Sequence, residues 1–433
     1  MDANSLAEGA KAQSACGYWP VIWMMCAVSA ISYLERSNVS VVGHLMRPAL
    51  GLDEELLGNV FSAFTLGYAL CQFPAGFLAD RFGPRRVLTL ALVCWGVFNL
   101  LTAFVQPLSQ WLGVFYTLLV IRLALGVSQA PTFPAAARSL RGCVPAKRQG
   151  LANAIVIAGI GIGSAVAPIF LGPLADELNW QNALVIGAIP AFLLAPVVFF
   201  LGRDDPLPVQ VAFPAPLGEP PAPRPEKDGL LKVGLRLATR RSLWLLTCSY
   251  LLQGYISYVF VFWFFHYLVE VRHFTILESS WLATMPWLLT IVTTPLGGFL
   301  SDRLVRRLGY PWGRRLLPML GLALAGGLLI LGAQVEDAYV AVVFLTICEG
   351  LVMSVEGPFW ASMIEVAGDD AGSAGGILNM GGNIGGTLSA SITPLIAKPW
   401  GWDVAFGVAA GLSVLGGFLW LWITPNSAAK GGT

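Results

Sequence analysis

Two arginines lie inside long apolar stretches of the sequence, where charged residues are rare. Arg36 and Arg122 fall within such stretches, and the other basic residues lie in the segments between them. A charge at the centre of a bilayer costs about 2.5–3.5 kcal/mol on insertion scales, so each of these residues needs a physical reason. Because a guanidinium presents a planar fork of donors that matches a carboxylate, we expect Arg36 to bind an acidic group of a ligand. The alternative is an ion pair with Glu35 or with a carboxylate on another helix.

Glu35 is an acid in the same apolar stretch. Side chains one residue apart on a helix point about 100° away from each other, so Glu35 and Arg36 need not pair. A buried carboxylate near an arginine can exchange a proton, and we interpret Glu35 as a proton site, with a permanently ionised structural role as the alternative. Arg122 lies seven residues before Gln129, on nearly the same helix face, and we assign it to a gating or coupling network.

Two further acids lie within one later apolar stretch. Glu349 and Glu356 are seven residues apart and therefore lie on nearly one helix face. One of them could supply a second proton site. The alternative is that they pair with Arg122 or another buried donor and stabilise the bundle.

The elements that must position these residues are membrane helices. Apolar residues make up 56% of the chain and charged residues only 12%, with a mean hydropathy of +0.69, whereas a soluble domain has roughly 25% charged residues. Apolar runs of about twenty residues recur along the whole chain, which predicts an all-α membrane protein of twelve transmembrane helices. They begin near Trp19, Glu55, Val87, Trp111, Leu151, Gln181, Leu243, Ser279, Leu316, Ala338, Gly372 and Asp403.

A proline-rich and then basic segment divides these helices into two sets of six. The predicted parts are a tail (1–18), a six-helix bundle (19–201), a linker (202–241), a second six-helix bundle (242–424) and a tail (425–433). Almost all basic residues lie in the linker, the tails and the connections on the same side, whereas the opposite side has Arg47, Arg272 and Lys398. The positive-inside rule therefore predicts that both termini and the linker are cytoplasmic, in the cell inner membrane.

The two halves also repeat. Residues 76–81, Gly-Phe-Leu-Ala-Asp-Arg, recur as Gly-Phe-Leu-Ser-Asp-Arg at 298–303, and the same offset of 222 residues relates Trp180 to Trp402. Equal orientation of the halves predicts a pseudo-two-fold axis along the membrane normal, a site near the midplane and alternating access by rocking of one half against the other.

Several motifs carry a resemblance to a known family. Residues 76–86 resemble the signature between helices two and three of the major facilitator superfamily. Within it, residues 32–40, 122–134, 359–361 and 379–386 resemble the anion:cation symporters, which include bacterial sugar-acid/proton symporters and the sialin and vesicular glutamate transporters. The resemblance implies proton-coupled import of an organic anion. Two positions depart from the family pattern: Glu35 replaces the usual Asp, and Gln129, which cannot titrate, replaces the usual Glu.

The residues and the resemblance together give three groups of candidates, with interhelical packing as the competing role for the polar and aromatic ones. Substrate binding is assigned to Arg36, Tyr33, Tyr68, Gln129, Trp360, Asn379 and Asn383. Proton coupling is assigned to Glu35, Arg122, Glu349 and Glu356. A cytoplasmic gate is assigned to Asp80, Arg81, Arg86, Asp302 and Arg303, whose ion pairs across the halves would lock the inner gate when the carrier faces outward. His266 is interpreted as a satisfied hydrogen-bonding residue and is left out of these groups.

The function predicted is import of a small organic anion by proton symport. The expected partners are that anion, protons and the lipid bilayer, with no cofactor, metal or nucleic acid, and the chain is expected to act as a monomer. A membrane-embedded enzyme is disfavoured because the three His residues have no ligand spacing. The alternatives left open are sodium coupling, uniport or exchange, a drug/proton exporter, and a nutrient sensor built on a carrier fold.

Overall fold

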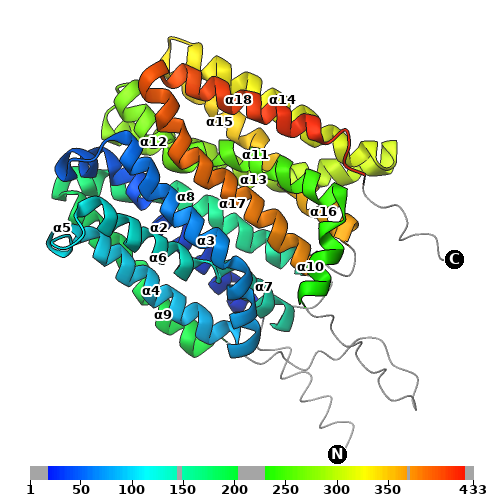
Figure 1. Ribbon diagram of the computed structural model, residues 1–433, viewed down its shortest axis with the longest axis horizontal. Coiled ribbons are helices and arrows are strands. Elements are labelled where there is room, and N and C mark those ends of the chain that lie inside the picture. Colours follow the sequence, from blue (N-terminus) through cyan, green and yellow to red (C-terminus); the bar gives the residue numbers. More distant parts are fainter. Residues whose placement is uncertain (1–17, 144–148, 203–229, 368–370, 425–433) are drawn as a thin grey trace, which may run out of the picture.

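The computed structural model describes residues 18–143, 149–202, 230–367 and 371–424, and the regular structure in these ranges is helical (Figure 1). In the first half the elements are α2 (Trp19–Leu50), α3 (Glu54–Phe82), α4 (Pro84–Ala103), α5 (Val105–Leu108), α6 (Val114–Gln129), α7 (Thr132–Cys143), α8 (Gln149–Leu178) and α9 (Trp180–Leu201). In the second half they are α10 (Leu230–Ala238), α11 (Arg241–Phe262), α12 (Phe264–His266), the π-helical turn η2 (Tyr267–Val271), α13 (Ile276–Leu308), α14 (Trp312–Gln334), α15 (Ala338–Ser354), α16 (Glu356–Ala367), α17 (Ala371–Trp400) and α18 (Trp402–Leu419).

Short local signals separate the long helices. Gly51 ends α2 in the left-handed region, with φ of 65°, and the Asp53 side chain then accepts a hydrogen bond from the backbone N–H of Leu56 to begin α3. At the corresponding place in the second half, Thr275 and Glu278 form a capping box that begins α13. The chain can therefore reverse direction within a few residues at the membrane surface.

The fourth span of each half is broken rather than continuous. The first half divides it into α6 and α7 at Ala130–Pro131, and the second half divides it into α15 and α16 at Val355. Pro131 has no backbone N–H to donate, which explains the first break. Counting α6–α7, α11–η2 and α15–α16 as one span each, the described helices form twelve spans, which confirms the predicted fold class.

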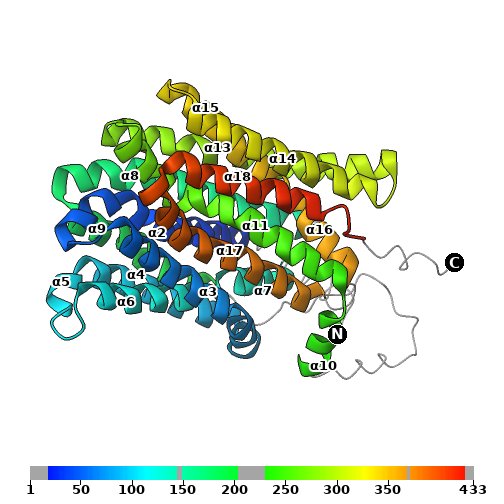
Figure 2. The same cartoon turned by 45° about the horizontal axis from the view of Figure 1, so that its top comes forward.

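The two halves lie side by side, with the blue-to-green helices in one and the green-to-red helices in the other (Figures 1 and 2). Helix α3 packs against α17 and α8 packs against α13, and these are the main contacts between the halves. An even number of spans places the start of α2 and the end of α18 at one end of the molecule. The opposite end carries the α2–α3 and α11–α13 connections and is termed the closed end below.

The contacts between the halves occur in pairs that are related by the offset of 222 residues found in the sequence. The Ser62 hydroxyl donates to the Thr387 carbonyl at 2.6 Å, and the Thr284 hydroxyl donates to the Ala165 carbonyl at 2.9 Å. Adding 222 to Ser62 gives Thr284, and adding 222 to Ala165 gives Thr387. The two interfaces are therefore equivalent under the pseudo-two-fold axis.

Glycines allow the same pair of interfaces to come close. A Cβ atom on Gly58 would collide with the Ala390 carbonyl and lie 2.9 Å from Pro394, and a Cβ atom on Gly172 would collide with the Ser280 hydroxyl. Gly58 and Ser280, and Gly172 and Pro394, are again 222 positions apart. Both glycines lie toward the closed end, where they let the helices of the two halves approach closely.

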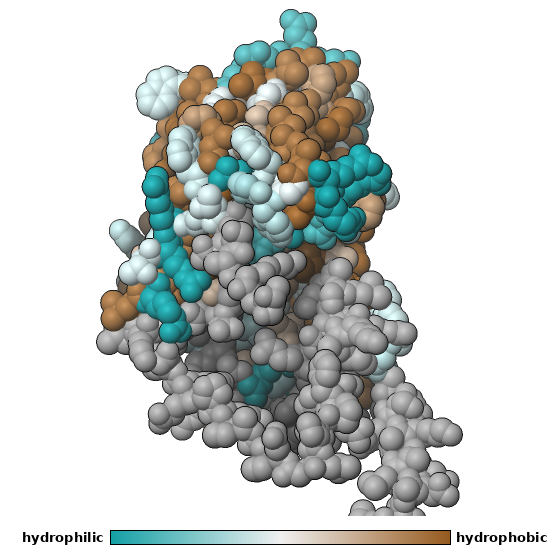
Figure 3. Space-filling model, turned by 90° about the vertical axis from the view of Figure 1, so that its right-hand side faces the viewer, coloured by the Kyte–Doolittle hydropathy of each residue, from teal (hydrophilic) through white to brown (hydrophobic). Residues whose placement is uncertain are grey.

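The outer surface of the helices is apolar. Within the described residues, nine helical spans have the length and hydropathy to cross a membrane. Helices α2, α3 and α17 are not among them, and α2 and α17 carry polar residues such as Glu35, Arg36 and Asn383. Large side chains such as Leu90 and Leu193, 65% and 66% exposed, cover the flanks. Figure 3 shows hydrophobic residues on the flank and hydrophilic residues at the end of the molecule that faces the viewer. The chain is a multi-pass membrane protein.

Candidate functional site

Arg36 lies in the middle of α2 and is surrounded by aromatic rings. Its side chain is 1% exposed, and its guanidinium carbon lies 4.4 Å from the ring centre of Tyr33, 4.6 Å from that of Tyr68 and 5.1 Å from that of Phe64. The negative faces of aromatic rings attract a cation, most strongly where water is excluded. These rings therefore stabilise the buried guanidinium without neutralising its charge.

Part of the Arg36 guanidinium has no hydrogen-bond acceptor among the described residues. One terminal nitrogen donates to the Tyr258 hydroxyl at 2.8 Å and to the Tyr33 hydroxyl at 3.2 Å. The other terminal nitrogen and Nε have no hydrogen-bond partner among the described residues. In the same residues no carboxylate lies within ion-pair distance of Arg36, so the alternative of a structural ion pair with Glu35 or another acid is wrong for this structure. A cation with free donors in a buried position suits an anionic ligand.

Tyr258 on α11 is a site residue that the sequence analysis missed. Its hydroxyl accepts from Arg36 and donates to Asn383 Oδ1 at 2.7 Å, and Asn383 Nδ2 donates to the Asn379 carbonyl at 2.8 Å. Tyr258 lies 222 residues after Arg36, so it is the pseudo-symmetric equivalent of Arg36. The repeat offset could have identified it, because residues on a two-fold axis contact their own equivalents.

A second pair confirms that α2 and α11 cross on the axis. The Ser40 hydroxyl donates to the Phe262 carbonyl at 2.6 Å, and these residues are also 222 positions apart. Arg36 from the first half and Asn379 and Asn383 from the second are thus brought to one place between the halves, joined through Tyr258.

Glu35 and Arg122 form a separate buried cluster next to this site. Both side chains are 0% exposed, and they interact electrostatically without a hydrogen bond between them. Arg122 donates to Asn38 Oδ1 at 3.5 Å, and Asn38 Nδ2 donates to Asn99 Oδ1 at 2.5 Å. The structure therefore brings Glu35 and Arg122 into one buried cluster.

Phe64 separates this cluster from Arg36. Its ring centre lies 5.2 Å from the guanidinium carbon of Arg122 and 5.1 Å from that of Arg36, so one ring contacts both cations. Gln129 is 0% exposed and interacts with Glu35. It lies with the coupling cluster, whereas Tyr68 lies against Arg36.

Glu349 and Glu356 both face α11, as their spacing predicts. The Ser257 hydroxyl donates to Glu349 at 2.9 Å, and Glu349 is 0% exposed. Glu356 begins α16 and is partly exposed. It accepts hydrogen bonds from the side chains of Tyr250, Gln253 and Trp360 at 3.0, 3.1 and 3.2 Å. Neither acid pairs with Arg122 in the described residues, but both accept from other donors on α11 and α16, which is the other form of the structural alternative.

The predicted gate residues are only partly described. The side chains of Asp80 and Arg81 lie outside the described residues, and Arg86 and Arg303 are exposed. Asp302 pairs with Arg314 at 2.7 Å, and Arg314 also pairs with Glu365 at 2.9 Å. These pairs stay within the second half and do not connect it to the first.

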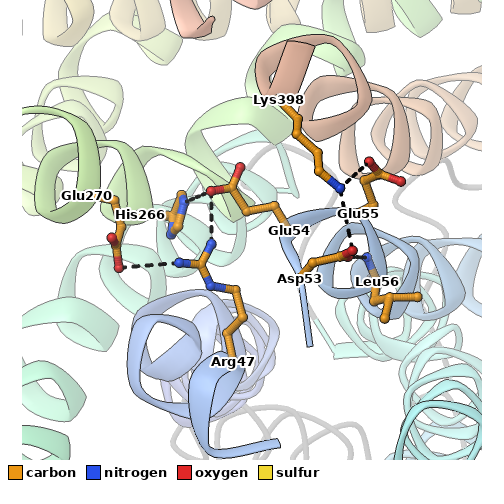
Figure 4. A network of polar contacts seen from close by, with 8 residues as sticks. All are labelled: Arg47, Asp53, Glu54, Glu55, Leu56, His266, Glu270 and Lys398. Atoms are coloured by element: carbon orange, nitrogen blue, oxygen red, sulfur yellow. Dashed lines mark hydrogen bonds and ion pairs between the residues drawn. The ribbon is translucent and has the colours of Figure 1, made fainter. Parts of the chain in front are cut away.

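A polar network at the closed end does connect the halves (Figure 4). Glu54 at the start of α3 accepts from Arg47 at 2.9 Å and lies 3.3 Å from His266 of the second half. Arg47 in turn lies 3.8 Å from Glu270. The sequence analysis left His266 out, because a single His in a membrane helix carries no signal for its partner.

Lys398 makes a second connection in the same view. Its ammonium lies 2.9 Å from Glu55 and 3.6 Å from Asp53, both on the first half. The closed end is thus held by ion pairs across the halves as well as by the close helix packing at Gly58.

Two six-helix halves around a buried cationic site define a membrane transporter and not an enzyme. The chain belongs to the Major Facilitator Superfamily, whose sequence model matches residues 25–386. The resemblance noted in the sequence motifs is therefore confirmed.

Curated relatives match almost the whole chain. A probable sulfoacetate transporter of Cupriavidus necator is 30% identical over 416 residues, which cover 94% of this chain and 93% of the relative. A probable galactarate/D-glucarate transporter of Escherichia coli is 27% identical, with 89% and 88% covered. The hexuronate transporter of Bacillus subtilis is 25% identical, with 91% and 92% covered. These relatives are transporters of organic acids.

Solved structures agree on the fold. A bacterial homologue of the human lysosomal transporter Spinster, solved inward-facing and unoccupied, gives a TM-score of 0.74 at 17% identity and covers 94% of this chain and 98% of its own. A nucleoside transporter gives a TM-score of 0.68 at 14% identity, with 93% and 99% covered. At these identities the likeness concerns the fold alone.

Proposed function

We propose that the protein is a secondary active transporter that imports a small organic anion, a sugar acid or similar carboxylate, by proton symport with alternating access. The observation that carries the proposal is Arg36, a buried guanidinium at the meeting point of the two halves with free donors and no acidic partner in the described residues. The acids after which the relatives are named support it.

The substrate's acidic group binds Arg36 in this proposal. Tyr33 and Tyr258 orient the guanidinium by accepting from it, and Tyr68 packs on its face. Asn379 and Asn383 offer amide groups to substrate hydroxyls, and Trp360 offers an aromatic face to the apolar side of a sugar-like ring. Gln129 contributes from the first half, because both polar atoms of its buried amide lack a hydrogen-bond partner within the described residues.

Glu35 is the proposed proton site. It is fully buried beside Arg122, and neither of its oxygens accepts a hydrogen bond within the described residues, so protonation would remove a buried charge. Phe64 contacts both Arg122 and Arg36, which provides a physical connection between proton and substrate. Glu349 and Glu356 are the alternative carriers of a second proton.

Alternating access follows from the two interfaces related by the pseudo-two-fold axis. With both termini cytoplasmic and the protein in the inner membrane, the closed end would face outward. Import requires the ion pairs of Glu54 and Lys398 to open. Asp80, Arg81, Arg86, Asp302 and Arg303 would then close the cytoplasmic end. Because one chain supplies both halves of the site, a monomer suffices.

Proteoliposome uptake tests the proposal. Purified protein is first screened for thermal stabilisation by a panel of organic acids, since a ligand that binds the native state raises the melting temperature by mass action. Stabilising acids are then tested for uptake driven by an inward proton gradient. Stabilisation without uptake would indicate a sensor, and uptake that is independent of the proton gradient would overturn symport.

A further inference from the structure

Glu356 is a carboxylate of the second half that has no cationic partner among the described residues. Its three hydrogen-bond donors, Tyr250, Gln253 and Trp360, are all neutral. Among the ion pairs of the described residues, none includes Glu356. Its side chain is partly exposed, unlike that of Glu349. An ionised Glu356 therefore presents a negative charge that the protein does not neutralise.

This carboxylate faces the same site as Arg36. The Tyr250 ring lies against Gly382 of α17, where an added Cβ would lie 2.7 Å from it, and the neighbouring Asn383 accepts from the Tyr258 hydroxyl that binds Arg36. The Tyr250 hydroxyl donates to Glu356, and so does the indole N–H of Trp360, one of the substrate-binding candidates. Arg36 and Glu356 thus approach the site from the first and the second half, one as a cation and the other as an acid.

We propose that Glu356 determines which organic acids bind, by accepting a hydrogen-bond donor at the end of the substrate opposite to the acidic group held by Arg36. This inference rests on the proposed function. The ligand is then a monoanion with a hydroxyl or ammonium group at its far end. A second acidic group there would face Glu356, and like charges in a poorly screened site repel strongly.

The proposed selection by Glu356 against a second acidic group is termed the Glu356 filter. Binding of three six-carbon acids that differ only at carbon 6 tests this filter at pH 8. Gluconate has a hydroxyl there, 6-amino-6-deoxygluconate an ammonium and glucarate a second carboxylate. The wild-type protein should bind glucarate at least ~10-fold more weakly than the better of the other two. Tighter binding of gluconate would identify the donor group of the substrate as a hydroxyl, and tighter binding of 6-amino-6-deoxygluconate would identify it as an ammonium. Glycerate, isoserine and tartronate provide the same comparison for a shorter substrate.

Two glutamine variants separate the charge of Glu356 from general effects. Glu356→Gln keeps the shape and removes the charge, so glucarate should bind within ~3-fold of gluconate. Glu336→Gln removes an exposed acid at the closed end and should keep the wild-type ratio. A wild-type preference for the dianions, or an unchanged ratio in Glu356→Gln, overturns the filter. The wild-type ratio of gluconate to glucarate affinity already tests the proposal, so the test remains possible even if a variant folds poorly.

Failure of the proposed function gives a different result. Anion recognition by Arg36 is refuted if Arg36→Ala binds every acid as the wild type does, or if neither acid series binds the wild-type protein. The Glu356 filter is then refuted as well, because it rests on that recognition. If Arg36→Ala loses binding while Glu356→Gln changes no ratio, only the filter falls.

Discussion

Arg36 shows how a membrane helix can retain a charge without an ion pair. Three aromatic rings lie within about 5 Å of its guanidinium, and two tyrosine hydroxyls accept from one of its nitrogens. An internal carboxylate would have satisfied the charge but would also have competed with an anionic ligand. The aromatic enclosure avoids that competition.

We predict that Arg36→Ala weakens binding of the stabilising acid by at least ~30-fold, because truncating one partner of a buried charge pair typically costs 2–5 kcal/mol. Arg36→Lys should restore little, since a point charge cannot reproduce a planar fork. Isothermal titration measures both. Tyr258→Phe is the graded control: it removes one hydroxyl and keeps the ring, and should cost no more than ~10-fold. Binding by Arg36→Ala within threefold of wild type would place the anion elsewhere.

At the scale of single residues, the sequence predicts the charges better than their partners. Arg36, Arg122 and Glu35 are identifiable because a charge within an apolar run needs a function or a partner. Tyr258 carries no such signal of its own, because a tyrosine in an apolar helix is compatible with simple packing, and only its offset of 222 residues from Arg36 points to it. His266 is also missed, because its partner Glu54 lies on the other half and is distant in the sequence.

Helix positions were predictable because apolar runs and caps are local signals. The predicted starts at Trp19, Ala338 and Gly372 lie within one residue of the observed ones, and the largest error, at Leu316, is four residues. The breaks at Pro131 and Val355 were not predicted. Hydropathy is continuous across both, so a broken span and a straight one have the same pattern.

The closed end depends on close approach of α3 and α17 at Gly58. We predict that Gly58→Ala weakens this closure, because its Cβ would collide with the Ala390 carbonyl, and overpacking typically costs 1–3 kcal/mol. Labelling of a cysteine placed at Ser391 by an impermeant reagent from outside should rise, and uptake should fall. Gly407→Ala is the matched control, since nothing lies within 4 Å of its added Cβ. Equal labelling in the two variants would show that Gly58 does not limit closure.

For the whole molecule, orientation in the membrane is a prediction from charge. The linker and the connections on its side hold almost all basic residues. A cysteine introduced at Pro220 should therefore react with an impermeant maleimide only after the cytoplasmic side is made accessible. A cysteine at Glu336, at the opposite end, is the control and should react in intact cells. Labelling of the Pro220 position from outside would show that the protein has the opposite orientation, and the proposed direction of transport would then be export.

Charge balance over a transport cycle is also a property of the whole molecule. The symporter resemblance assigns acids on helices one and four to proton coupling, and in this chain only Glu35 remains at those two positions because Gln129 cannot titrate. Gln129 is buried and interacts with Glu35, and the described residues that act on Glu35 include no second acid. Glu349 and Glu356 lie instead on the other half, against α11.

We therefore predict that one proton accompanies one monovalent anion and that uptake is electroneutral. In proteoliposomes, a valinomycin-imposed potential of about 100 mV without a pH gradient should drive almost no accumulation, whereas a pH gradient should. One net charge per cycle would correspond to about 2.3 kcal/mol, or nearly 50-fold accumulation, so the two cases are well separated. Gln129→Glu should introduce voltage dependence by adding a second proton. Strong voltage-driven uptake by the wild type would contradict the single-proton mechanism, and its loss in Glu349→Gln or Glu356→Gln would locate the second proton in the other half.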